Sequence, residues 1–170
     1  MMKLKLRPRK PMMIKMNEGH KNENSIRLKA KIAAVRVRGL AGINRGINDT
    51  MDMLKLFRKN FCVVLENAPS NVGMLKKAKD YITYGEMDDE TYKLLIEKRS
   101  IPYKGPETDS SGKIKYNKFN LVDGKKIKKY FKLNSPKKGY GRKGVKKTFK
   151  QGGALGYRGD KINDLLRRMI

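Results

Sequence analysis

The chain has 170 residues, of which 42 are Lys or Arg and 16 are Asp or Glu, so its formal net charge is +26 at pH 7. This length suits one globular domain with basic extensions rather than two full domains. The excess of cations calls for an anionic partner, and nucleic acid fits best because each phosphate contact releases condensed counterions. The absence of Trp and of any long apolar segment argues against a membrane protein or a secretory signal.

Residues 1–31 are basic, poor in aromatic residues and interrupted by Pro8 and Pro11. Such a segment cannot bury enough apolar surface to fold alone. We therefore interpret it as an N-terminal extension.

The next part of the chain carries the periodic patterns of folded elements. Residues 32–38 alternate in their second half and then meet Gly39, which predicts a half-buried strand. Apolar residues at helical spacing predict a helix over residues 47–57, with Asn44 as its cap. The continuous apolar run of residues 61–65 predicts a buried strand.

A second helix is expected after a cap at Ser70 or Asn71. Residues 81–84 are rich in strand formers and are followed by Gly85, so they predict a short third strand that ends there. The acidic residues 88–90 favour the start of a third helix. The apolar face of the second helix would consist of Met74, Leu75, Ala78 and Ile82.

The order strand, helix, strand, helix, strand predicts a core domain over residues 32–100. Residues 101–158 form a Gly-rich and Lys-rich segment, and no Asp or Glu lies between positions 125 and 150. We expect this segment not to fold on its own but to bind RNA. Residues 159–170 predict a C-terminal helix capped by Asp160. Its apolar face would consist of Ile162, Leu165, Leu166 and Met169.

The basic segment contains aromatic residues and glycines among its cations. Lys and Arg bind phosphates, aromatic rings can stack on unpaired bases, and glycines allow close backbone approach. The alternative is a solvated basic loop whose aromatic rings pack internally. The predicted RNA contacts of the whole chain are Lys3, Lys5, Arg7, Arg9, Lys10, Arg36, Arg38, Lys128, Lys129, Lys137, Lys138, Tyr140, Arg142, Lys143, Lys146, Lys147, Phe149, Lys150 and Arg158.

The sequence offers no catalytic, cofactor or metal site. The single cysteine, Cys62, lies in an apolar run and the single histidine, His20, lies in the extension, which excludes a zinc site and an internal disulfide. The acids of residues 88–90 suit a helix N-terminus better than a metal site. Residues 139–144 have the glycine spacing of a dinucleotide-binding loop but lack the strand before it and the helix after it.

Several motifs resemble the ribosomal protein L-thirty family of archaea, called L-seven in eukaryotes. The order and spacing of these motifs carry the resemblance, which covers most of residues 32–170. The motifs are IAAVRVRGLAGI at residues 32–43, DTMDML at 49–54, NVGML at 71–75, YITYG at 81–85, QGGALG at 151–156 and DKINDLL at 160–166.

This resemblance implies an α+β fold, with a small, largely antiparallel three-stranded sheet, two helices on one face and a ferredoxin-like order. It also implies a structural constituent of the cytoplasmic large ribosomal subunit that binds ribosomal RNA and neighbouring ribosomal proteins, without a cofactor, a small-molecule substrate or a catalytic residue. The alternative is a free-standing nucleic-acid-coating or RNA-chaperone protein, which would have no reason to carry this family pattern.

Overall fold

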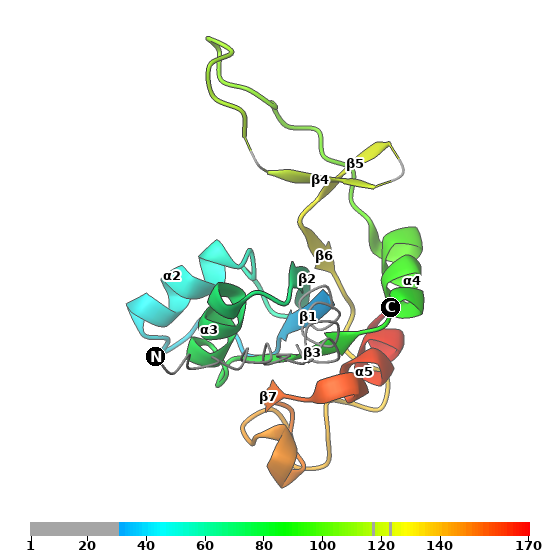
Figure 1. The fold of residues 1–170 in the computed structure, drawn as a ribbon. Helices are drawn as coiled ribbons and strands as arrows, with labels where there is room; N and C mark the ends of the chain where they lie inside the picture. The colour runs from blue at the N-terminus through cyan, green and yellow to red at the C-terminus, as the bar shows by residue number, and fades with distance from the viewer. Residues whose placement is uncertain (1–30, 117, 123) are drawn as a thin grey trace, which may run out of the picture.

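The structure is a computed structural model that describes residues 31–116, 118–122 and 124–170. A five-stranded sheet, in the order β6-β2-β1-β3-β7, forms its centre (Figure 1). Its neighbouring strands are antiparallel, except that β3 and β7 are parallel. The strands of this sheet are β1 Lys31–Arg36, β2 Phe61–Glu66, β3 Ile82–Met87, β6 Tyr130–Lys132 and β7 Gly156–Tyr157.

Helices cover both faces of the sheet. Ile32 and Ala34 of β1 pack in the cluster that contains α2 and α3 residues, whereas Ala33 and Val35 pack in the cluster that contains α4 and α5 residues. Because side chains alternate along a strand, both faces of β1 are buried, as suits the central strand. The helices are α2 Arg45–Met53, α3 Pro69–Lys77, α4 Asp89–Arg99 and α5 Ile162–Met169, with short 3₁₀ turns η1 Phe149–Gln151 and η2 Gly159–Lys161.

The predicted α+β class and the order strand, helix, strand, helix, strand are confirmed. Asn44 caps α2 as predicted, because its side-chain oxygen accepts a hydrogen bond from the Gly46 N–H at 2.9 Å. The helices α2 and α3 lie on one face, as expected, and α4 and α5 add a layer on the other. The predicted apolar face of the C-terminal helix is buried in full, namely Ile162, Leu165, Leu166 and Met169.

The sheet has five strands rather than the three that we predicted. Both additional strands come from the basic segment: in β6, Phe131 pairs with Cys62 of β2, and in β7, Gly156 pairs with Thr83 of β3. Phe131 is buried in the core. Part of the basic segment therefore completes the fold.

Gly85 does not end β3, which continues to Met87. A Cβ atom at Gly85 would lie 2.2 Å from the carbonyl oxygen of Gly159, so a side chain would prevent the approach of η2 to the sheet. This glycine serves close packing between two segments rather than strand termination.

Two predicted helix caps are wrong. The N-cap of α3 is Ala68, followed by a proline in the first turn, rather than Ser70 or Asn71. The N-cap of α5 is Lys161, because Asp160 belongs to the 3₁₀ turn that precedes this helix. The helix α3 thus begins at Pro69, a residue favoured in a first helical turn, and α5 begins where the preceding 3₁₀ turn ends.

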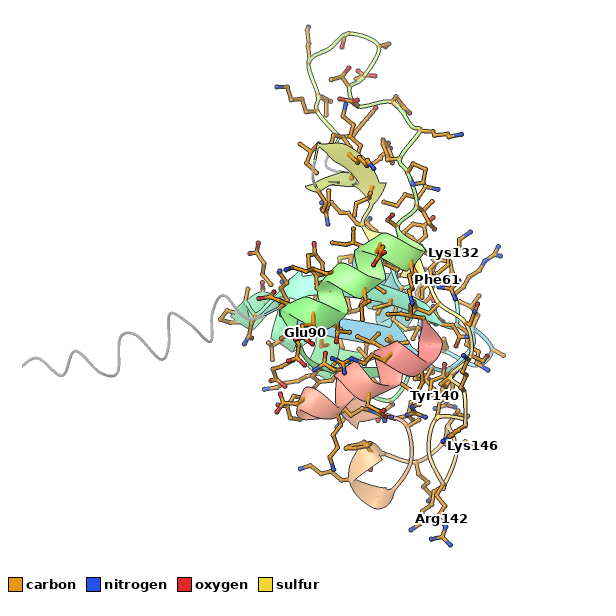
Figure 2. All side chains as sticks on the ribbon, turned by 90° about the vertical axis from the view of Figure 1, so that its right-hand side faces the viewer. Phe61, Glu90, Lys132, Tyr140, Arg142 and Lys146 are labelled. Atoms are coloured by element: carbon orange, nitrogen blue, oxygen red, sulfur yellow. The ribbon has the colours of Figure 1, made fainter. Side chains whose placement is uncertain are left out.

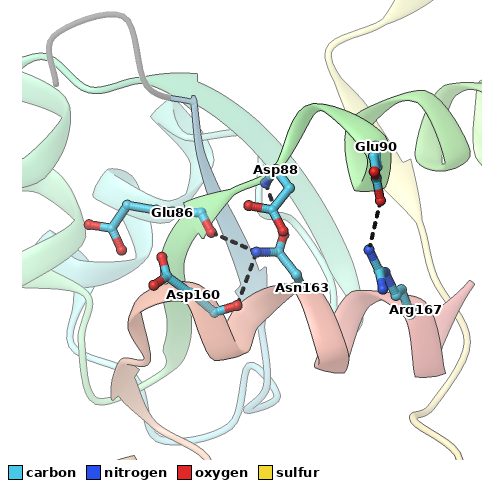
Figure 3. Close-up of polar contacts among 6 residues, drawn as sticks. All are labelled: Glu86, Asp88, Glu90, Asp160, Asn163 and Arg167. Carbon is cyan, nitrogen blue, oxygen red and sulfur yellow. Dashed lines mark hydrogen bonds and ion pairs between the residues drawn. The ribbon is translucent and has the colours of Figure 1, made fainter. Parts of the chain in front are cut away.

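Asn163 joins the end of β3 to the start of α5 (Figure 3). Its side-chain oxygen accepts a hydrogen bond from the Asp88 N–H at 3.1 Å. Its side-chain nitrogen donates to the carbonyl oxygens of Glu86 at 3.2 Å and Asp160 at 3.0 Å. One buried amide thus satisfies three backbone groups where the two elements meet.

Candidate nucleic-acid interface

Residues 137–158, which we call the C-terminal loop, lie at one end of the sheet (Figure 1). Hydrogen bonds define its backbone; for example, the Phe149 N–H donates to the Leu155 carbonyl at 2.8 Å. A Cβ atom at Gly153 would lie 2.2 Å from the Lys147 carbonyl oxygen, so only glycine permits this approach. The loop therefore has a defined conformation although most of it lacks helix and strand.

The buried Arg158 anchors the C-terminal loop to the sheet. Its Nε donates to the Thr83 hydroxyl at 3.3 Å, and its Nη2 donates to the carbonyls of Ala154 at 3.2 Å and Tyr140 at 3.4 Å. Its guanidinium carbon lies 4.4 Å from the centre of the Phe149 ring. Burial lowers the pKa of Arg158. Arg158, one of the predicted RNA contacts, thus supports the loop from inside, and the ring of Phe149, another predicted contact, packs beside its guanidinium.

Tyr140 and Arg168 provide two further attachments. The Tyr140 hydroxyl donates a hydrogen bond to the side-chain oxygen of Asn60, and burial raises the pKa of Tyr140 to about 12. Arg168 of α5 donates to the carbonyls of Lys137 at 3.1 Å and Gly139 at 3.0 Å. The sequence showed Arg168 only as a cation at the end of a helix, so its role in the loop was missed.

The remaining cations of the C-terminal loop are exposed, and residues 137–158 contain no Asp or Glu. Arg142 and Lys146 extend away from the body of the protein (Figure 2). A backbone of fixed conformation thus presents several exposed ammonium and guanidinium groups, as phosphate binding requires. The exposed members are Lys137, Lys138, Arg142, Lys143, Lys146, Lys147 and Lys150.

A hollow of about 710 Å³ opens beside the C-terminal loop. Lys138, Arg142, Lys161 and Arg168 contribute cations to its lining, whereas Asp164 is its one acidic residue. Lys161 and Arg168 were not among the predicted contacts because they lie in a different sequence segment. The excess of cations in a concave site favours a phosphate group over a cationic or apolar ligand.

Arg36 was predicted to contact RNA, but its side chain is fully buried. Its guanidinium donates to the carbonyls of Leu56 at 2.7 Å, Phe57 at 3.0 Å, Arg38 at 3.0 Å and Gly39 at 3.1 Å. These bonds join two loops beside β1. The alternation of residues 32–38 suggested a solvent-facing side chain, but α2 and the loop after it cover that face of the strand.

Three further predicted contacts, Arg38, Lys128 and Lys129, lie outside the C-terminal loop. The Arg38 guanidinium lies 4.9 Å from the centre of the Tyr81 ring, and the Lys128 ammonium lies 5.8 Å from that of Tyr130. Lys128 and Lys129 precede β6, at the other end of the sheet (Figure 1). Five predicted contacts lie outside the described residues, namely Lys3, Lys5, Arg7, Arg9 and Lys10.

Reactive groups are few in the part of the chain that the structure describes. Cys62 is buried, and burial raises the pKa of its thiol to about 12, so the nucleophilic thiolate is scarce at neutral pH. Among residues 31–116, 118–122 and 124–170, no three His, Cys, Asp or Glu side chains converge as a metal site would require. None of the helices in these ranges is both apolar and long enough to span a bilayer.

Comparison with known proteins relates the chain to one family. A family model described as ribosomal protein L30p/L7e matches residues 32–82. The chain is 45% identical over 149 residues to the large ribosomal subunit protein uL30 of Methanopyrus kandleri, across 79% of this chain and 100% of that protein. It is 44% identical over 154 residues to the large ribosomal subunit protein uL30 of Nanoarchaeum equitans, across 83% of this chain and 99% of that protein.

Proposed function

We propose, because the chain belongs to the ribosomal protein L30p/L7e family, that it binds the ribosomal RNA of the large subunit through its C-terminal loop. Its place is that of a structural, non-enzymatic constituent of the large subunit in the cytoplasmic ribosome. There it would also contact neighbouring ribosomal proteins and support subunit assembly and translation.

The observation that carries the proposal is the set of exposed cations on the hydrogen-bonded backbone of the C-terminal loop. Buried groups hold the loop in place, so its lysines lose less conformational freedom on binding than those of an unstructured tail. The resulting contacts position the protein on RNA through phosphates, and they need no recognition of base sequence.

We also propose that different segments of the chain have different roles. Residues 32–100 supply most of the rigid platform, residues 101–158 supply RNA contacts, and residues 159–170 tie the C-terminal loop to that platform through Arg168. Residues 1–31 would add basic contacts to the same subunit.

Mass spectrometry of sucrose-gradient fractions from the source cells, before and after a high-salt wash, tests the proposal. We expect stoichiometric recovery with the large subunit at moderate salt. Recovery in the light fractions alone would contradict it and would favour a free-standing nucleic-acid-coating protein.

A matched pair of variants tests the role of the C-terminal loop. One replaces Lys143, Lys146, Lys147 and Lys150 with Ala, and the control replaces the exposed lysines Lys77, Lys79, Lys93 and Lys98 with Ala. Both lose four charges, so we expect only the loop variant to leave the large subunit at a clearly lower salt concentration than the unmodified protein.

A further inference from the structure

The segment of residues 101–129 connects α4 to β6, and its described residues, all but 117 and 123, project from the sheet as a long arm (Figures 1 and 2). Its base contains the hairpin of β4 Phe119–Val122 and β5 Lys125–Lys128. Both views show that the arm leaves the sheet at the end opposite to the C-terminal loop. Of the predicted RNA contacts, only Lys128 and Lys129 lie in the arm.

The arm has an ordered backbone of its own. The Tyr103 N–H donates to the Lys126 carbonyl at 2.9 Å, and the Lys128 N–H donates to the Ile101 carbonyl at 2.9 Å. Farther out, the Tyr116 N–H donates to the Glu107 carbonyl at 2.8 Å. Paired chains thus run from the base of the arm toward its tip.

The arm is held at its base and exposed elsewhere. Ile127 is buried in the core, where it packs the base of the arm against the α4–α5 side of the protein. By contrast, Ile114 and Leu121 are 60% and 66% exposed. A two-stranded ribbon with so little buried surface is marginally stable in water, so a partner is expected to cover it.

The charges of the arm identify that partner. The arm carries eight Lys against three acidic residues, and Lys113, Lys115, Lys118 and Lys125 are exposed. The rings of Tyr103 and Phe119 stack with centroids 5.4 Å apart, and the Lys126 ammonium lies 5.5 Å from the centre of the Phe119 ring. Lysines beside aromatic faces suit a polyanion with planar bases, which is RNA.

The side of the protein between the two basic ends lacks this excess of cations. Residues 82–99 and 159–170, which include α4 and α5, carry seven acidic and six basic residues. Two of these cations lie in ion pairs, Arg167 with Glu90 at 3.4 Å and Arg168 with Asp164 at 3.1 Å. An RNA backbone that crossed this layer from one end of the protein to the other would therefore gain little electrostatic attraction from it.

We propose that the arm is a second RNA-binding site and that it engages a different RNA segment from the one bound by the C-terminal loop. The protein would therefore hold two RNA segments together, one at each end of its sheet. This inference rests on the proposed function, since it assumes that the first site binds RNA.

A capture assay with the full chain tests the inference. Two 20-nucleotide RNA hairpins of the same mixed sequence are used, one biotinylated and one fluorescent, and the fluorescent hairpin retained on streptavidin is measured at equimolar protein. We expect the unmodified protein to retain the fluorescent hairpin. Binding of one hairpin to the protein without such retention would overturn the second site but not the proposed function, whereas absence of all RNA binding would overturn both.

Variants locate the second site. Replacement of Lys113, Lys115, Lys118 and Lys125 with Ala should lower retention at least about five-fold while the first hairpin remains bound, since these four contacts supply much of one site. The control replaces Lys77, Lys79, Lys93 and Lys98 and should lower retention less than two-fold, about the effect of charge loss alone. Equal retention by the arm variant and the control would overturn the inference.

Discussion

Arg36 is a buried cation whose guanidinium donates to four backbone carbonyls. Replacement with Ala would leave these carbonyls without their donors and would open a cavity. We expect the Arg36→Ala variant to lose about 3 to 5 kcal/mol of unfolding free energy. Urea denaturation followed by circular dichroism measures this loss.

The control is Arg38→Ala, because Arg38 is only partly buried and its guanidinium makes one long hydrogen bond, to the Asp80 carbonyl at 3.3 Å. Its replacement should cost less than about 1 kcal/mol. If the two variants were equally stable, Arg36 would not have the structural role that we assign to it.

Tyr140 predicts a dependence of stability on alkaline pH. Burial raises its pKa to about 12 in the folded protein, against about 10 in the unfolded chain. Between these values the unfolded chain releases the phenolic proton and the folded protein retains it, so stability is fully present below pH 10 and falls as pH rises toward 12. The contribution lost is about 2 to 3 kcal/mol.

This contribution is measured by urea denaturation of the unmodified protein and the Tyr140→Phe variant at pH 9 and pH 11. The unmodified protein should lose more stability between the two pH values than the variant does. Parallel losses would show that Tyr140 titrates normally in the folded protein.

At the scale of secondary-structure elements, Asn163 connects β3, α4 and α5 through three hydrogen bonds to backbone groups. Asn163→Ala should lose about 2 to 3 kcal/mol of unfolding free energy, because it removes all three part-buried hydrogen bonds at once. Thermal denaturation measures this loss, and Asn120→Ala, at an exposed position of β4, should change stability by less than about 0.5 kcal/mol. A similar loss in both variants would contradict the role of Asn163.

A pair of glycines tests the packing of β3 against η2. At Gly85 a Cβ atom would meet the Gly159 carbonyl oxygen at 2.2 Å, so Gly85→Ala should cost at least about 2 kcal/mol. At Gly73, inside α3, a Cβ atom would meet nothing within 4 Å, so Gly73→Ala should add about 0.5 to 1 kcal/mol of stability. Thermal denaturation compares the two variants, and unfolding midpoints that shifted in the same direction would contradict the role of Gly85 in this packing.

The sequence predicted those elements whose signal is local. The helices and the strands β1 to β3 each show an apolar pattern in their own sequence. By contrast, β6 has three residues and β7 has two, and they form only through pairing with β2 and β3. In the candidate site, composition predicted a basic loop, but it could not separate exposed lysines from Arg36 and Arg158. That separation depends on which distant segments cover each side chain.

For the whole molecule, the number of phosphate contacts sets the salt dependence of RNA binding. If about eight phosphates are neutralised, a plot of log affinity against log salt concentration should have a slope on the order of −6 to −7. Fluorescence anisotropy with a labelled RNA hairpin measures this slope. The variant with Ala at Lys143, Lys146, Lys147 and Lys150 should reduce its magnitude by about 3, and affinity independent of salt would contradict binding through phosphates.

The order of the two packing layers along the chain has a consequence for biosynthesis. The buried residues of the cluster between the sheet and α2 and α3 all lie within residues 32–84, whereas the opposite cluster needs Leu165, Leu166 and Met169 of α5. A nascent chain can therefore assemble its first layer while translation continues, but the second layer must wait until α5 has left the exit tunnel. A chain whose synthesis stalls before α5 would display the uncovered apolar side of β1 to chaperones and proteases.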